Sequence, residues 1–217
     1  MKRILFQGDS ITDCGRAREN DVNVGTGYAL LTKSQLGFEH PGEYEFYNRG
    51  ISGNKIVDLY ARIKRDIINL APDYISILVG VNDVWHEFDF GGHDGVDADK
   101  FEKIYCMLVE EIKAALPNVK IMIMEPFCLQ GRGTENTGEQ PNKWNMFNEE
   151  VKKRAEKAKK VAQEYNLTFV ELQNVFNKAA EVKEGTYWLE DGVHPTAMGH
   201  ELICREWIKA FKKMKAH

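Results

Sequence analysis

Short apolar runs alternate along this chain with longer stretches of helical character. Strand-length runs, mostly rich in Ile, Val, Phe or Tyr, occupy 3–7, 44–48, 74–79, 119–124 and 167–170. Helices are expected at 28–36, 55–70, 99–115, 144–165 and 197–211, where apolar residues recur mainly at three- and four-residue steps. Because parallel strands need such crossovers, the alternation predicts an α/β domain with a five-stranded parallel sheet covered by helices on both faces. In open sheets of this kind, binding sites form beyond the carboxyl ends of the strands.

Composition agrees with one globular domain spanning residues 1–217. Apolar residues make up 43% of the chain and charged residues 29%, a balance that allows a continuous core. The formal net charge of -4 argues against nucleic acid as a partner, because phosphate binding needs a basic footprint. It favours a neutral, small-molecule substrate.

Neither a membrane span nor a disulfide or zinc framework is indicated. No stretch approaches the roughly 18 consecutive apolar residues of a spanning helix, and the apolar run at 3–7 is too short for a secretory signal. The four cysteines are widely spaced and include no Cys-x-x-Cys pair. We therefore expect a cytoplasmic protein that does not associate with membranes.

Two connections are too long for plain linkers. They cover 84–98 and 125–142, and both follow predicted strands. Loops of more than about 12 residues in compact domains are usually functional or disordered. Both are expected to overhang a site at the carboxyl edge of the sheet.

The segment directly after the first strand contains a candidate nucleophile. Residues 8–12 read Gly-Asp-Ser-Ile-Thr. The glycine permits a tight turn at the strand end, after which Ser10 can present its hydroxyl at the edge of the sheet. The same pentapeptide also suits an ordinary strand-to-helix turn in which Ser10 or Thr12 caps a helix.

A nucleophilic serine needs a base, and among the six histidines of the chain His194 is the best placed. Residues 191–195 read Asp-Gly-Val-His-Pro just before the last predicted helix, where Pro195 suits the first helical position. Asp191 can reach the imidazole across this turn, fix its tautomer and stabilise the imidazolium formed during proton transfer. The alternative is a surface turn with a capping aspartate.

Two further segments could donate hydrogen bonds to an oxyanion, which acyl transfer creates from the carbonyl oxygen. Residues 48–53, after the second strand, contain Gly50 and Gly53, and residues 80–83, after the third, contain the side-chain amide of Asn82. Each segment alone is equally consistent with a simple turn. Together with Ser10 and His194 they would gather at one end of the sheet.

These four blocks, in this order, resemble those of the SGNH or GDSL hydrolases and span residues 8–194. The resemblance implies a three-layer, flavodoxin-like fold with strand order 2-1-3-4-5. It also implies a serine esterase that works through an acyl-enzyme, with Ser10 as nucleophile, His194 as base and Asp191 orienting the base. The oxyanion donors would be the backbone N–H groups of Ser10 and Gly53 and the side chain of Asn82. Residue 11 is Ile where the motif has Leu, a change between aliphatic side chains.

The longer strings 8–16 and 80–85 look like the branch that contains bacterial intracellular acetylxylan esterases. That likeness implies removal of acetyl groups from carbohydrate esters such as acetylated xylo-oligosaccharides, and it makes a homo-oligomer plausible. Flat aromatic faces suit sugar rings, so we expect Trp85 and Trp188 to contact substrate. Asp9, the residue before Ser10, is also expected to contact it. Other aromatic residues near the motifs, which can equally well cover the core, are Phe88, Phe90, Phe127 and Tyr187.

Neither a metal nor an organic cofactor is expected. His194 and His200 are six residues apart, a spacing that places them on different faces of a helix. Cys14 has no base beside it in the sequence and is expected to be a small buried residue. Two alternatives remain: a lysophospholipase or thioesterase acting on longer acyl chains, and a non-catalytic module that binds a mononucleotide or a sugar.

Overall fold

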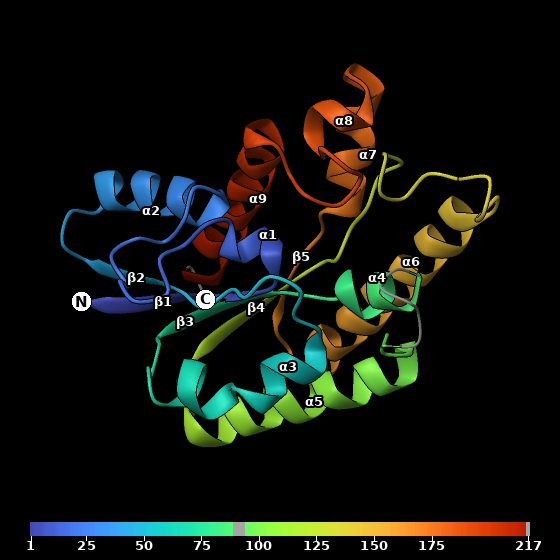
Figure 1. The fold of residues 1–217 in the computed structure, drawn as a ribbon. Helices are drawn as coiled ribbons and strands as arrows, with labels where there is room; N and C mark the ends of the chain where they lie inside the picture. Colours follow the sequence, from blue (N-terminus) through green and yellow to red (C-terminus); the bar gives the residue numbers. More distant parts are fainter. Residues whose placement is uncertain (89–93, 216–217) are drawn as a thin grey trace.

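The computed structural model describes residues 1–88 and 94–215, and its centre is one parallel β-sheet (Figure 1). The strands are β1 (Lys2–Gly8), β2 (Tyr44–Asn48), β3 (Tyr74–Leu78), β4 (Lys120–Met124) and β5 (Thr168–Val170). They lie in the order β2-β1-β3-β4-β5, and every neighbouring pair is parallel. The predicted α/β class and the strand order 2-1-3-4-5 are therefore confirmed.

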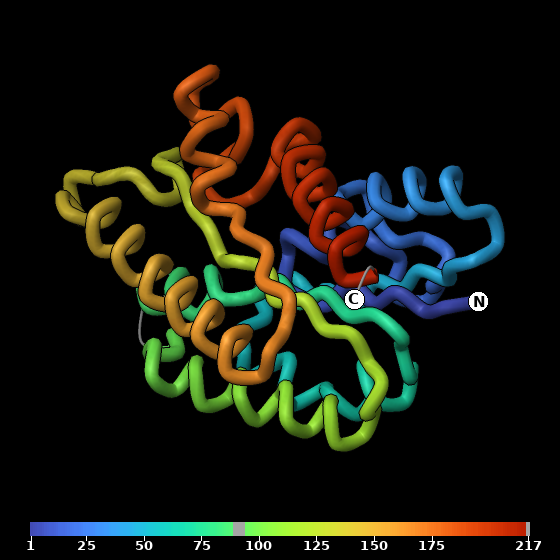
Figure 2. Tube along the Cα trace, turned by 180° about the vertical axis from the view of Figure 1, so that it is seen from behind, coloured from blue at the N-terminus to red at the C-terminus, as the bar shows by residue number. Residues whose placement is uncertain are grey.

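Helices cover both faces of this sheet, as Figures 1 and 2 show. The described helices are α1 (Ser10–Asp13), α2 (Tyr28–Glu39), α3 (Ile56–Ala61), the π-helix η1 (Lys64–Ile68), α4 (Asn82–Phe88), α5 (Ala98–Ala115), α6 (Lys143–Glu164), α7 (Gln173–Val182), α8 (Gly185–Trp188) and α9 (Ala197–Lys215). Helices α2 and α9 pack together on one face, and α3, α5 and α6 cover the other. None of the described helices combines the length and the apolar character that crossing a membrane requires.

Alternating side chains of the central strands pack into two separate hydrophobic cores, one on each face of the sheet. In β1, Ile4 and Phe6 point into the core beneath α2 and α9, whereas Leu5 points into the core above α3 and α5. In the first of these cores Trp207 of α9 packs against Phe6 and stacks on Phe211, with ring centroids 5.5 and 5.0 Å apart. Burial on both faces explains why the strands read as continuous apolar runs in the sequence.

Three helical regions differ from the sequence-based prediction. The stretch 55–70 forms α3 and η1 instead of one helix, and the connection 84–98 begins inside α4. Helices α7 and α8 were not predicted. Helix α7 has 10 residues, of which only Phe176 is buried, and α8 has 4 residues, none of them buried, so both are too short to give the extended apolar pattern that marks a longer helix in a sequence. The connection 125–142 is irregular, as predicted.

Candidate active site

The turn after β1 and the turn before α9 bring a hydroxyl, an imidazole and a carboxylate into one hydrogen-bonded chain. Ser10 is the first residue of α1, and its Oγ lies 2.9 Å from Nε2 of His194. On the other side of the ring, Nδ1 lies 2.7 Å from Oδ2 of Asp191. Ser10 is half-buried and the His194 side chain is 44% exposed, so a substrate can reach both.

Ser10 owes its position to tight packing around the end of β1. A Cβ at Gly8 would lie 2.3 Å from the carbonyl oxygen of Leu78 and 2.5 Å from Oγ1 of Thr12, so only glycine fits there. Asp9 caps α1, because its Oδ1 accepts a hydrogen bond from the backbone N–H of Ile11 at 3.0 Å. The Asp9 side chain is completely buried, and burial raises its pKa to about 7. The structure therefore does not support substrate contact by Asp9, which instead shapes the turn that presents Ser10.

Asp191 holds both the ring and the backbone of His194. Its Oδ1 accepts hydrogen bonds from the backbone N–H groups of Val193 and His194 at 2.9 and 2.8 Å, while Oδ2 faces Nδ1. Burial tends to raise the pKa of Asp191, but these hydrogen bonds lower it to about 2. The hydrogen bond between Nδ1 of His194 and the Asp191 carboxylate raises the pKa of His194. With Nδ1–H donated to the carboxylate, the neutral ring directs the free electron pair of Nε2 at the Ser10 hydroxyl.

The two predicted donor segments lie against each other. Gly53 adopts φ +81, a left-handed conformation that favours glycine, and a Cβ there would meet no atom within 4 Å. Asn82 starts α4, is 8% exposed and donates one amide hydrogen from Nδ2 to the carbonyl oxygen of Asn54 at 3.1 Å. Its second amide hydrogen stays available for a ligand.

Asp83 was not singled out from the sequence, yet it anchors this arrangement. Its two carboxylate oxygens accept the backbone N–H of Ile56 at 3.1 and 3.3 Å, which ties the start of α3 to the start of α4. The residue is completely buried, and burial raises its pKa to about 7. An acidic residue in the first turn of a helix is ordinarily an exposed partner of the helix dipole. Its sequence position therefore gave no sign of burial.

The long connection 125–142 packs on the turn that carries Asp191. The N–H of Leu129 donates to the carbonyl of Gly192, and the N–H of Gly133 to the carbonyl of Asp191, each at 2.8 Å. Thr134 is fully buried and its Oγ1 donates to the carbonyl of Leu129 at 2.7 Å. This connection therefore supports the turn from outside, at the predicted edge of the sheet.

The aromatic residues divide between the site and other places. The half-buried Trp85 lies beside the site, with its ring centroid 6.0 Å from that of His194. Trp188 instead donates its indole N–H to the carbonyl of Lys183 at 3.1 Å and lines a groove between α7 and α9. Phe127 is buried against Phe176 in the core, and Phe90 lies outside the described residues. Substrate contact by Trp188 therefore has no support in this structure, whereas Trp85 is well placed for it.

Cys14 is half-buried rather than buried, which corrects the prediction from sequence. Its Sγ lies 3.3 Å from Nε2 of His200. The other ring nitrogen of His200 accepts the backbone N–H of Tyr28 at 3.1 Å, so Nε2 carries the proton and points it at the sulfur. Burial lowers the pKa of His200 to about 4, which keeps the ring neutral. His200 therefore has no free lone pair with which to act as a base toward Cys14.

Within residues 1–88 and 94–215, no group of three or more His, Cys, Asp or Glu side chains is arranged to hold a metal ion. The site combines a hydroxyl polarised by an imidazole with amide donors nearby. This combination suits attack on a carbonyl carbon.

Comparison with known proteins identifies relatives along nearly the whole chain. The GDSL-like Lipase/Acylhydrolase family matches residues 6–202. An acetylxylan esterase from Geobacillus stearothermophilus is 34% identical over 216 residues, which cover 96% of this chain and 93% of that protein. A solved structure of an acetylxylan esterase from that organism has a TM-score of 0.83 at 33% identity, covering 96% of this chain and 93% of the other. A candidate GDSL-like lipase from Parabacteroides merdae has a TM-score of 0.87 at 36% identity and covers 97% and 95% of the two chains. The chain therefore belongs to the GDSL-like lipase/acylhydrolase family.

Proposed function

We propose that this protein is a serine esterase that removes acetyl groups from carbohydrate esters such as acetylated xylo-oligosaccharides. Membership of an acylhydrolase family makes it a carboxylic ester hydrolase acting on a small ester. The observation that carries the proposal is the hydrogen-bonded chain from Ser10 through His194 to Asp191. The relative named an acetylxylan esterase supports the acetyl and carbohydrate parts.

The geometry supports two-step acyl transfer. As Oγ of Ser10 attacks the ester carbonyl, Nε2 of His194 takes its proton, and Asp191 stabilises the resulting imidazolium. The tetrahedral intermediate collapses when His194 passes that proton to the departing alcohol, which leaves Ser10 acylated. In the second step His194 takes a proton from water as the water oxygen attacks the acyl carbon, and it returns that proton to Oγ of Ser10 when the tetrahedral intermediate releases the acid.

Asn82→Ala should lower kcat for p-nitrophenyl acetate by about 10²–10³ with little change in KM, because an oxyanion donor acts mainly on the transition state. The backbone donors of Ser10 and Gly53 would remain. Asn82→Asp keeps the size of the side chain but replaces the N–H donor with a carboxylate that repels the oxyanion, so a loss at least as large is expected. Steady-state kinetics of the three proteins would test this, and a fall of less than threefold in both variants would remove Asn82 from the oxyanion hole.

Acyl-chain preference tests the substrate part of the proposal. Both long connections are rich in polar residues, and long acyl chains would need an apolar groove. We therefore expect kcat/KM to fall by at least about tenfold from p-nitrophenyl acetate to the decanoate, since a short polar site cannot bury the longer chain. The butyrate should lie between them. A higher kcat/KM for the decanoate would favour the lysophospholipase or thioesterase alternative and contradict the acetyl-ester proposal.

Acetylated xylo-oligosaccharides are the direct test of the carbohydrate part. Acetate release should be measured on these compounds and on p-nitrophenyl acetate over the same range of ester concentrations. The sugar ester is expected to have the lower KM when the ester concentration is varied, because Trp85 offers a flat face for a sugar ring beside His194. An enzyme that cleaves the phenyl ester but releases no acetate from the oligosaccharide would keep the esterase and reject this substrate class.

A further inference from the structure

We propose that Arg62 is a positioning residue that assembles the oxyanion hole: it holds the segments that carry Ser10 and Gly53 directly, and it holds Asn82 through Asn54. The inference rests on the proposed function, because it needs Ser10, Gly53 and Asn82 to be those donors. Arg62 is the residue after α3 and is 8% exposed. Neither the sequence motifs nor the family resemblance drew attention to it.

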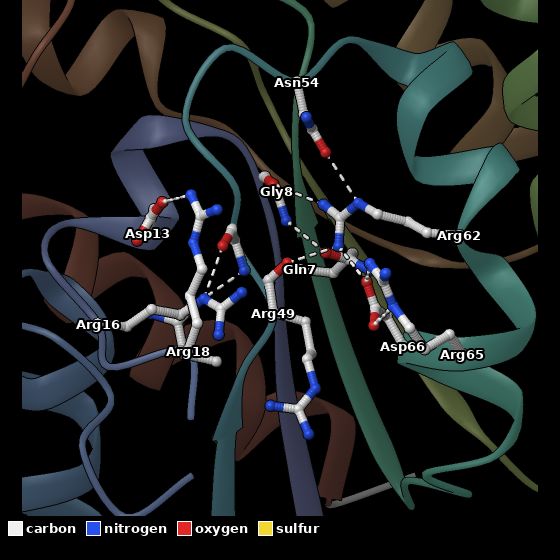
Figure 3. Close-up of polar contacts among 12 residues, drawn as sticks. Gln7, Gly8, Asp13, Arg16, Arg18, Arg49, Asn54, Arg62, Arg65 and Asp66 are labelled. Carbon is white, nitrogen blue, oxygen red and sulfur yellow. Dashed lines mark hydrogen bonds and ion pairs between the residues drawn. The ribbon is translucent and has the colours of Figure 1, made fainter. Parts of the chain in front are cut away.

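The guanidinium of Arg62 donates to three acceptors outside its own helical segment (Figure 3). Nη2 donates to the carbonyl of Gly8 at 3.1 Å and Nη1 to the carbonyl of Arg49 at 2.6 Å. Nε donates to Oδ1 of Asn54 at 2.8 Å. One rigid group therefore joins the end of β1 to both ends of the loop 49–54.

Two of these three contacts, at Gly8 and Asn54, lie close to a proposed oxyanion donor. Gly8 precedes Ser10 by two residues, and Asn54 directly follows Gly53. The carbonyl of Asn54 also accepts the amide hydrogen of Asn82. A shift of Asn54 would therefore move the Gly53 N–H and release Asn82 at the same time.

Asp66, four residues on, fixes the direction of the guanidinium. Nη1 of Arg62 lies 2.7 Å from Oδ2 of Asp66, and both side chains are less than a tenth exposed. Burial would raise the pKa of Asp66, but hydrogen bonds from Arg65 and Arg62 hold it below its ordinary value. The pair is thus ionised and desolvated, which makes its geometry stiff.

Lysine cannot replace this contact. The planar guanidinium offers five donors in a fixed fork, whereas an ammonium is a single point of donation on a flexible stem. One ammonium cannot reach Gly8, Arg49 and Asn54 in the same plane. Charge alone would survive the substitution, and the bridging geometry would not.

Arg65 supplies a matched control. It binds the same carboxylate through Nε and Nη2 at 2.7 and 3.0 Å, but its side chain is 69% exposed, and within residues 1–88 and 94–215 its hydrogen bonds are with Asp66 and not with the loop 49–54. In Arg62→Met, Arg65 still pairs with Asp66, so no buried charge is left without a partner. In Arg65→Met, Arg62 keeps that role.

The experiment compares wild type with Arg62→Met, Arg62→Lys and Arg65→Met. It measures kcat and KM for p-nitrophenyl acetate and the inhibition constant of a trifluoromethyl ketone, whose hemiketal oxyanion would occupy the same donors. Arg62→Met should lower kcat by about 10- to 100-fold and weaken the inhibitor in parallel, since small displacements of preorganised groups cost that much. KM should change by less than about threefold. Arg62→Lys should resemble Arg62→Met, and Arg65→Met should stay within about twofold of wild type.

The outcomes separate this inference from the proposed function. Arg62 variants that keep wild-type kcat and inhibitor affinity would overturn the inference while leaving the esterase intact. Equal losses in Arg62→Met and Arg65→Met would overturn it too, because the effect would then follow from the ion pair alone. If Arg62→Met does not fold, Arg62→Lys decides by the same two measurements. Wild-type protein that neither cleaves the ester nor binds the ketone would contradict the proposed function instead.

Discussion

Ser10→Ala should reduce turnover of p-nitrophenyl acetate by about 10⁴- to 10⁶-fold, because it removes the atom that forms the covalent intermediate. The remaining rate would come only from the amide donors around the carbonyl and from substrate binding. KM should change little. Ser34→Ala is a suitable control, since Ser34 is exposed on α2 and lies in no described part of the site, so its kinetics should equal those of wild type.

Covalent labelling makes this prediction independent of substrate choice. A serine-directed organophosphate should add one mass increment to the wild-type protein and to Ser34→Ala, as seen by intact mass spectrometry. Ser10→Ala should gain none. Wild-type protein that is not labelled would favour the alternative of a non-catalytic mononucleotide- or sugar-binding module. Labelling of Ser10→Ala would place the nucleophile elsewhere.

The sequence was sufficient to predict the parallel sheet because the pattern that marks each strand lies within a few consecutive residues. Strands buried on both faces read as short apolar runs, and the amphipathic stretches between them force parallel pairing. The strand order came from the family resemblance, and the structure confirms it. Helices α7 and α8 escaped prediction because few of their residues face the core.

Candidate site residues were predictable where the backbone turn alone decides their direction. Ser10 directly follows a strand end, which places it at the edge of the sheet. Asp191 and His194 share one short turn, so their spacing in the sequence already brings these two side chains within reach of each other. The positions of the Asp9 and Trp188 side chains depend on tertiary packing. Neighbouring segments bury Asp9, and Trp188 of α8 lies against the groove between α7 and α9. Packing of this kind cannot be predicted from the residue type or from its neighbours in the sequence.

Arg62 and Asp83 illustrate a second limit. Both are charged, and charged residues on helical segments are mostly exposed. Their importance comes from contacts with residues that no local sequence pattern links to them: Arg62 binds Gly8, 54 residues away, and Asn54, 8 residues away, and Asp83 binds Ile56, 27 residues away. Only the folded arrangement shows that these two side chains hold together the segments around the candidate site.

Asp191→Asn is expected to lower kcat/KM at neutral pH by about 10⁴-fold, and the reason is the identity of the atom facing Nδ1 of His194. One carboxylate oxygen now accepts the N–H groups of Val193 and His194, and the other accepts Nδ1–H. Asparagine has a single side-chain oxygen, which we expect to accept the backbone N–H groups of Val193 and His194. The NH₂ group would then face Nδ1, force the proton onto Nε2 and leave no lone pair for Ser10.

The pH profile of the same variant separates this cause from a loss of structure. His194 must be neutral to act as base, so kcat/KM of the wild type should fall as the pH drops through a His194 pKa that Asp191 raises above its ordinary value. Without the carboxylate, the acid limb should move to lower pH. Glu190→Gln is the matched control: Glu190 is exposed and paired with Arg132, so its loss should leave kcat/KM within about twofold. If Asp191→Asn lowers kcat/KM by less than tenfold and the acid limb of its pH profile does not move, the backbone of the turn alone orients His194. Asp191 would then have a structural role only.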